Sequence, residues 1–127
     1  MGLQLDTMGK DSNIIRSYSP GEIRIKTGIY TQSLVLSASV LHAGWPLDDI
    51  TALEDSHIEL ILEQEPELIL LGTGARLVFP SAEKLRPIIE RGIGYEIMDT
   101  AAACRTYNVL VGEGRHVVAG LIIGKDS

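Results

Sequence analysis

The chain has little of what several classes of protein require. A single cysteine, Cys104, among 127 residues excludes an internal disulfide and fits a reducing cytoplasm. No run approaches the ~20 apolar residues of a membrane-spanning helix, so we expect no direct membrane insertion. The first residues also lack the charged and then apolar layout of a signal peptide. These absences predict a cytoplasmic protein.

Positive charge and aromatic side chains are scarce as well. There are 17 acidic residues against 11 Lys and Arg, which gives a net charge of −6. A nucleic-acid binder needs a clustered basic surface to displace counterions, so we expect no nucleic-acid partner. Aromatic residues make up only 5% of the chain, so the core must consist mainly of Leu, Ile and Val.

Complete catalytic and metal-binding sets are missing too. The three histidines, His42, His57 and His116, are scattered at spacings that do not fit a metal site. The sequence contains no G-x-S-x-G motif and no Ser-His-Asp set. Cys104 lies a full turn inside its predicted helix, so we expect a small core residue rather than an activated nucleophile. The sequence therefore predicts no metal and no cofactor, and it favours a non-enzymatic protein.

What is present is enough for one domain with a real core. We expect a single α/β domain over residues 13–124, with a flexible tail at 1–12 and a short tail at 125–127. The first half contains short, partly alternating runs that predict an antiparallel hairpin layer, followed by an irregular crossing at 42–46. The runs cover residues 14–18, 22–26, 28–30 and 33–37.

The second half alternates strand and helix. Strands are predicted at 68–71, 93–98 and 115–123, and helices at 55–64, 81–91 and from 99 or 100 to 111. Ser56 and Glu59 have capping-box spacing, Pro66 ends the first helix, and Pro87 predicts a kink or an irregular first turn in the second. The continuous apolar run at 68–71 is typical of a strand covered on both faces. The direction of the last strand is left open.

A candidate ligand site follows from the ends of two predicted strands. Ligands of α/β folds bind where parallel strands end, and glycines there let a ligand approach the backbone. A guanidinium and a helix start would suit an anion. Tight-turn and helix-cap roles remain open as alternatives, because the loop is neither a Walker A motif nor G-x-G-x-x-G. The predicted ligand-binding residues are Gly72, Thr73, Gly74, Arg76, Asp99 and Thr100, with Tyr107 and Asn108 behind them.

The same segments carry a resemblance to a known family. The motifs lie at 67–74, at 92–110 and at 113–115. Over roughly residues 13–124 the chain resembles a family of small α/β domains of unknown function. This family includes archaeal and bacterial hypothetical proteins, the mitochondrial complex I (NADH dehydrogenase) assembly factor 3 and an adipogenesis-associated domain protein. The pattern at 98–100 and 106–108 looks closest to the proteobacterial branch.

The resemblance implies a fold and a role. The implied fold has three layers, a β layer plus α/β/α, around a central mixed and mostly parallel sheet. The family has no assigned catalytic activity, and its one defined role is assembly of a respiratory enzyme through protein contacts. We therefore expect a non-enzymatic interaction or assembly factor, with complex I as a candidate target. An exposed apolar patch near Trp45 and Pro46, or on the first hairpin, would contact a protein partner or a second copy. The alternative is a small-molecule binder or enzyme that uses the crevice at Gly72–Arg76 and Asp99–Thr100.

Overall fold

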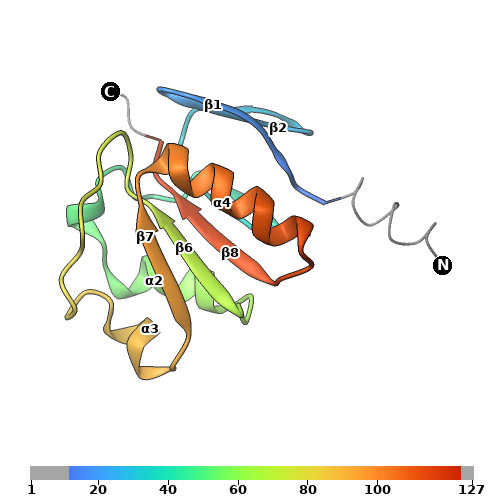
Figure 1. The fold of residues 1–127 in the computed structure, drawn as a ribbon. Coiled ribbons are helices and arrows are strands. Elements are labelled where there is room, and N and C mark those ends of the chain that lie inside the picture. Colours follow the sequence, from blue (N-terminus) through green and yellow to red (C-terminus); the bar gives the residue numbers. More distant parts are fainter. Residues whose placement is uncertain (1–11, 124–127) are drawn as a thin grey trace.

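The computed structural model describes residues 12–123, which form two sheets and the helices that cover them (Figure 1). The first sheet is antiparallel and contains β1 (Ile15–Ser19), β2 (Glu22–Ile25) and β3 (Gly28–Tyr30), in that order. Its first turn relies on Gly21, whose φ of 90° lies in the region that favours glycine. This sheet confirms the hairpin layer expected at the start of the domain. The tails expected at 1–12 and 125–127 lie outside the described residues, apart from Ser12.

The second sheet has five strands in the order β5-β4-β8-β6-β7. Strand β6 pairs parallel with β7 and with β8, whereas β4 pairs antiparallel with β8 and with β5. The sheet is therefore mixed, as expected, with as many antiparallel as parallel pairings. Its strands are β4 (Leu34–Leu36), β5 (Leu41–Ala43), β6 (Leu68–Gly72), β7 (Gly94–Met98) and β8 (Val117–Leu121).

Two expectations for the first half of the chain are wrong. The run at 33–37 does not continue the hairpin layer but supplies β4 of the five-stranded sheet. All three residues of β4 are buried, which is the pattern of an inner strand rather than of a half-exposed hairpin. The segment at 42–46 is not irregular from its start either, because its first two residues complete the edge strand β5.

The helices are η1 (Ile50–Ala52), α2 (Asp55–Leu62), α3 (Arg86–Glu90) and α4 (Thr100–Gly112). The expected capping pair at the start of α2 is wrong, since the N-cap is Glu54 and its N–H donates to Nδ1 of His57 at 3.0 Å. Helix α3 begins later than expected and has Pro87 in its first turn, where a missing N–H leaves no hydrogen bond unmade. The expected helix begins with non-α turns over residues 82–85, so the irregular first turn expected at Pro87 is confirmed.

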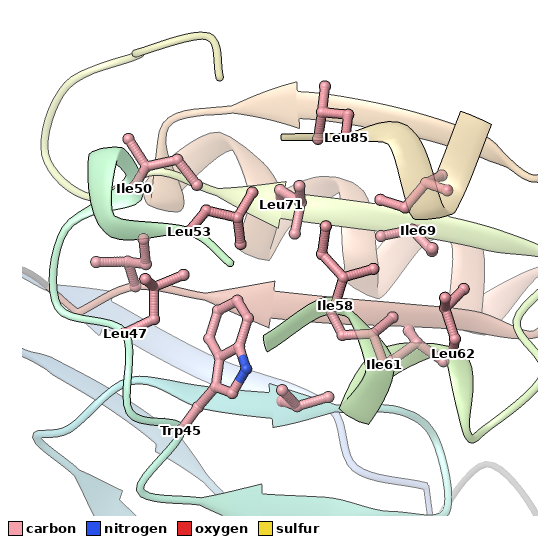
Figure 2. Close-up of a cluster of buried hydrophobic side chains, with 14 residues drawn as sticks. Trp45, Leu47, Ile50, Leu53, Ile58, Ile61, Leu62, Ile69, Leu71 and Leu85 are labelled. Carbon is pink, nitrogen blue, oxygen red and sulfur yellow. The ribbon is translucent and has the colours of Figure 1, made fainter. Parts of the chain in front are cut away.

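Each face of the five-stranded sheet is covered by its own apolar core. On one face, residues of η1, α2 and α3 pack against alternate residues of the strands, and Figure 2 shows Trp45 among Leu47, Leu53 and Ile58. An exposed patch around Trp45 is a wrong prediction, because this side chain is only 2% exposed, while the alternative on the first hairpin stays a prediction. A Cβ on Gly120 of β8 would lie 2.6 Å from the Trp45 ring, so glycine makes room for the indole.

On the other face, α4 and the three-stranded sheet share a second core. Ala103 and Tyr107 of α4 pack here with Ile15 and Ile23 of the first sheet and with Leu70 of β6. The neighbours of Leu70 in the strand, at positions 69 and 71, belong to the opposite core. This alternation confirms that β6 is covered on both faces, and it fixes α4 in place beside the end of that strand.

Candidate functional site

The two strand ends predicted to form a site lie side by side at one edge of the sheet. Gly72, the last residue of β6, is paired with Met98, the last residue of the parallel strand β7. Beyond this pair, the Thr73 N–H donates to the Met98 carbonyl and the Thr100 N–H donates to the Gly74 carbonyl, both at 2.9 Å. The structure thus brings together five of the eight predicted site residues, which are Gly72, Thr73, Gly74, Asp99 and Thr100. We call this group the strand-end junction.

Thr100 is the centre of the strand-end junction and is fully buried. Its hydroxyl accepts from the Gly74 N–H at 2.8 Å and donates to the Ile122 carbonyl at 2.7 Å. One side chain therefore links the segments that follow β6 and β8 to the start of α4. Gly72 permits this close approach, since a Cβ there would lie 2.9 Å from the Thr100 hydroxyl and 3.1 Å from its Cα.

Thr73 organises the loop that leaves the strand-end junction. Its hydroxyl donates to the Arg76 carbonyl at 2.6 Å and accepts from the Val78 N–H at 3.2 Å. Gly74, with a φ of 102°, allows the chain to turn directly after Thr73. The loop continues to α3 and stands away from the sheet (Figure 1). Its conformation is thus set by hydrogen bonds within the protein.

Asp99 and Arg76 differ in their surroundings. The Asp99 carboxylate accepts from the Ala102 N–H at 2.9 Å and caps α4, which is the helix-cap role left open above. Arg76 is exposed and forms no ion pair within residues 12–123. A ligand-binding role for the strand-end junction and Arg76 stays a prediction.

Tyr107 and Asn108 lie elsewhere. They are seven and eight residues beyond Thr100, or about 10–12 Å along the helix. The Tyr107 hydroxyl donates to the Asn13 carbonyl at 2.7 Å, and burial raises its pKa. The Asn108 amide donates to the Ile15 carbonyl at 2.8 Å and accepts from the Ile15 N–H at 2.9 Å. Both side chains therefore fasten the start of the domain to α4 rather than stand behind the strand-end junction.

The one cysteine of the chain lies in the core. Cys104 is buried, and that burial raises the pKa of its thiol to about 12, with the charge of Arg105 opposing the shift. The thiol is therefore protonated near neutral pH, as expected of a core residue. Within residues 12–123, no group of three His, Cys, Asp or Glu side chains could hold a metal ion.

Sequence reasoning overlooked a group of apolar side chains on the loop after the strand-end junction. Leu77 is 48% exposed, Val78 39% and Phe79 69%. The signal was present as three consecutive apolar residues between Arg76 and Pro80, in a segment where no strand or helix was predicted. We call these three residues the apolar loop.

Comparison with known proteins finds a matching family model and solved structures of the same fold. A family model described as protein of unknown function (DUF498/DUF598) matches residues 15–122. A crystal structure of a Bordetella parapertussis protein is 33% identical and superposes with a TM-score of 0.82, covering 88% of this chain and 96% of that one.

Two curated relatives have names that point in different directions. The "13 kDa major membrane protein" of Francisella tularensis is 39% identical, over 80% of this chain and 84% of that protein. The "NADH dehydrogenase [ubiquinone] 1 alpha subcomplex assembly factor 3" of Danio rerio is 34% identical, over 86% of this chain. The chain spans only 63% of the length of that factor. No helix within residues 12–123 is long and apolar enough to cross a membrane, and the cytoplasmic location stays a prediction.

Proposed function

This chain belongs to the DUF498/DUF598 family of proteins of unknown function, and from that premise we propose that it is a non-enzymatic assembly factor. It would act by binding a protein partner, and the proposed target is a respiratory NADH dehydrogenase, as in the name of the Danio rerio relative. The observation that carries the proposal is the exposure of the apolar loop.

The apolar loop is unusual for the surface of a domain of this size. Six large hydrophobic side chains are exposed among residues 12–123, and three of them are consecutive here. Phe79 is the only phenylalanine of the chain, yet it points to solvent instead of joining either core. Scattered apolar side chains on a surface are ordinary, whereas a contiguous group marks a contact surface. A large aromatic side chain is also a typical anchor of a protein interface.

The loop is also held in shape before any partner binds. The two hydrogen bonds of the Thr73 hydroxyl fix the backbone from position 73 to position 78. A loop ordered in advance loses less conformational entropy on binding than a free one, so more of the contact energy appears as affinity. Arg76 adds a positive charge beside the apolar side chains. The matching partner surface has an apolar pocket for Phe79 and a carboxylate near Arg76.

A photo-crosslinking experiment tests this proposal. A photoreactive phenylalanine analogue replaces Phe79 in the full chain expressed in its native cell. A matched control places the same analogue at Val109, which is 58% exposed on α4. We expect adducts with subunits of NADH dehydrogenase from position 79 and at least about fivefold fewer from position 109, since anchors concentrate at the centre of an interface.

Three results would contradict the proposal. Equal yields from the two positions would show that the apolar loop is not a specific contact. Adducts that contain no NADH dehydrogenase subunit would remove the proposed target. Adducts only between copies of this chain would replace the assembly role with self-association.

The alternative is a small-molecule binding protein or enzyme that uses the crevice at Gly72–Arg76 and Asp99–Thr100. The observation that favours it is Arg76, an exposed guanidinium without an ion-pair partner within residues 12–123. A thermal-shift screen against metabolites, with Arg76→Ala in parallel, tests it. A ligand at 100 times its dissociation constant adds about 2.7 kcal/mol, which is several degrees for a domain of this size. A shift that persists in Arg76→Ala, or no shift at all, counts against it.

A further inference from the structure

A pocket lies between β1 and α4, and the first residue of α4 in its lining, Ala101, directly follows Thr100 of the strand-end junction. Its volume is about 240 Å³. One wall comes from β1 and the other from one face of α4, where the lining residues at 101, 104, 105 and 108 follow helical spacing. The side chains that matter for its chemistry are Arg16, Ser17, Tyr18, Cys104, Arg105 and Asn108.

Local structure fixes both walls of this pocket. The pairing of β1 with β2 shifts register between Ile15 and Ser17, so Arg16 is the extra residue of a β-bulge. Bulges re-aim side chains, and this one places Arg16 on the pocket instead of in a regular ladder. Just before the bulge, the Asn108 side chain forms hydrogen bonds with both the N–H and the carbonyl of Ile15. Strand and helix are therefore held at a set separation.

The pocket concentrates positive charge on an acidic protein. Arg16 and Arg105 come from opposite walls, and no Asp or Glu lines the space between them. Neither arginine forms an ion pair within residues 12–123. The whole chain carries a net charge of −6, so two guanidiniums that line one pocket contrast with the acidic balance of the chain. The planar guanidinium fork matches the oxygens of a carboxylate or a phosphate.

The other polar groups of the pocket are neutral donors near neutral pH. Burial, and then the neighbouring Cys104, raise the pKa of the Tyr18 hydroxyl, with Asp99 adding to the shift. Burial also raises the pKa of the Cys104 thiol to about 12. The Ser17 hydroxyl completes the set. An anion would therefore meet two positive charges and no thiolate or phenolate in the lining, while the Asp99 carboxylate, which lies outside the lining, acts on Tyr18 and Cys104.

We propose that this pocket binds a small oxyanion, namely the phosphate or carboxylate group of a small metabolite held between Arg16 and Arg105. The volume lies below the ~300–1,000 Å³ of pockets that take drug-sized ligands, so a ligand of a few heavy atoms fits better than a nucleotide. This proposal does not depend on the assembly role, because the apolar loop contributes nothing to the pocket.

An NMR titration of the ¹⁵N-labelled full chain tests the proposal. The probes are inorganic phosphate and succinate, each against sodium chloride at matched ionic strength. We expect saturable shifts of the amides of Ser17, Tyr18, Arg105 and Asn108 with at least one probe. Arg16→Gln and Arg105→Gln should each weaken binding by about 10-fold or more, because each removes a charged hydrogen-bonding group.

The matched control is Arg91→Gln, which removes the same charge at the exposed C-cap of α3. This variant should bind the probe as the unchanged protein does. Ser17→Asp adds a repelling carboxylate and should abolish binding, while the spectrum itself reports that each variant is folded. Shifts that never saturate, that appear equally with sodium chloride, or that weaken equally in Arg91→Gln would overturn the proposal. If both probes bind, the tighter one identifies the class of oxyanion.

Discussion

The strand-end junction and the apolar loop adjoin each other in the chain but have opposite surroundings. In the junction, the hydroxyl of Thr100 is fully buried and both donates and accepts within the protein. Three residues after Gly74, the loop turns Leu77, Val78 and Phe79 toward solvent. The first region uses its polar groups to hold the fold, whereas the second leaves apolar surface unused by the fold.

This contrast shows that residue types typical of a ligand site can also serve to hold the fold together. Glycines and threonines at strand ends resemble a ligand site, but Gly72 makes room for Thr100, and Thr100 joins three segments. The hydroxyl of Thr73 then sets the backbone of the loop that follows. The strand-end junction therefore positions the apolar loop, which is the surface proposed to contact a protein partner.

The largest effect on stability is expected from Thr100→Val. A harmless substitution here would contradict the contrast between the strand-end junction and the apolar loop. Valine keeps the shape but leaves the buried Gly74 N–H and Ile122 carbonyl without partners. An unsatisfied buried group costs about 1–3 kcal/mol, so we expect a loss of about 2–4 kcal/mol in the free energy of unfolding. Urea unfolding measures it. The control Thr106→Val, on the same helix, should change stability by less than about 0.5 kcal/mol. Equal stability of the two variants would show that the junction is not what holds this edge.

An intermediate effect is expected from Asn108→Ala, which sharpens the comparison by loosening a different region. The substitution removes both hydrogen bonds to Ile15 and should cost about 1–2 kcal/mol. Hydrogen exchange of the Ile15 amide should accelerate, while the amide of Gly74 stays protected. Asn108→Asp keeps an acceptor for the Ile15 N–H but places a carboxylate oxygen against the Ile15 carbonyl, so it should cost at least as much as Asn108→Ala. Equal acceleration of hydrogen exchange at the Ile15 and Gly74 amides would contradict the view that Asn108 acts only on β1.

Much of the fold was predictable because its second half follows strong patterns. The apolar run at 68–71 and the capping Asp99 predicted β6 and α4 closely. The first half was harder, because the short strands β3 and β4 follow each other in sequence but pair in different sheets. That choice depends on β8, which lies more than 80 residues away from β4. Propensity cannot supply such long-range pairing.

The place of the candidate site was predictable, whereas the hydrogen bonds within it were not, and its ligand-binding role stays a prediction. The parallel pairing of β6 and β7 brought the strand ends together as expected. Whether a hydroxyl faces a ligand or a neighbouring carbonyl depends on packing around it, and the Ile122 carbonyl that Thr100 contacts comes from another strand end. Trp45 shows the same limit, since its burial requires the missing side chain of Gly120. Residues distant in sequence decided both outcomes.

The most direct test of the account measures stability and partner binding together in the double variant Leu77→Ser/Phe79→Ser. Leu77 is 48% exposed and Phe79 69%, so we expect the free energy of unfolding to fall by only about 1 kcal/mol. Co-purification of NADH dehydrogenase subunits with the full chain should fall at least about 10-fold, as for loss of an interface anchor. Val109→Ser, an exposed apolar position on α4, should leave both quantities unchanged. Undiminished co-purification by a folded double variant, or a loss of stability like that of Thr100→Val, would contradict the account.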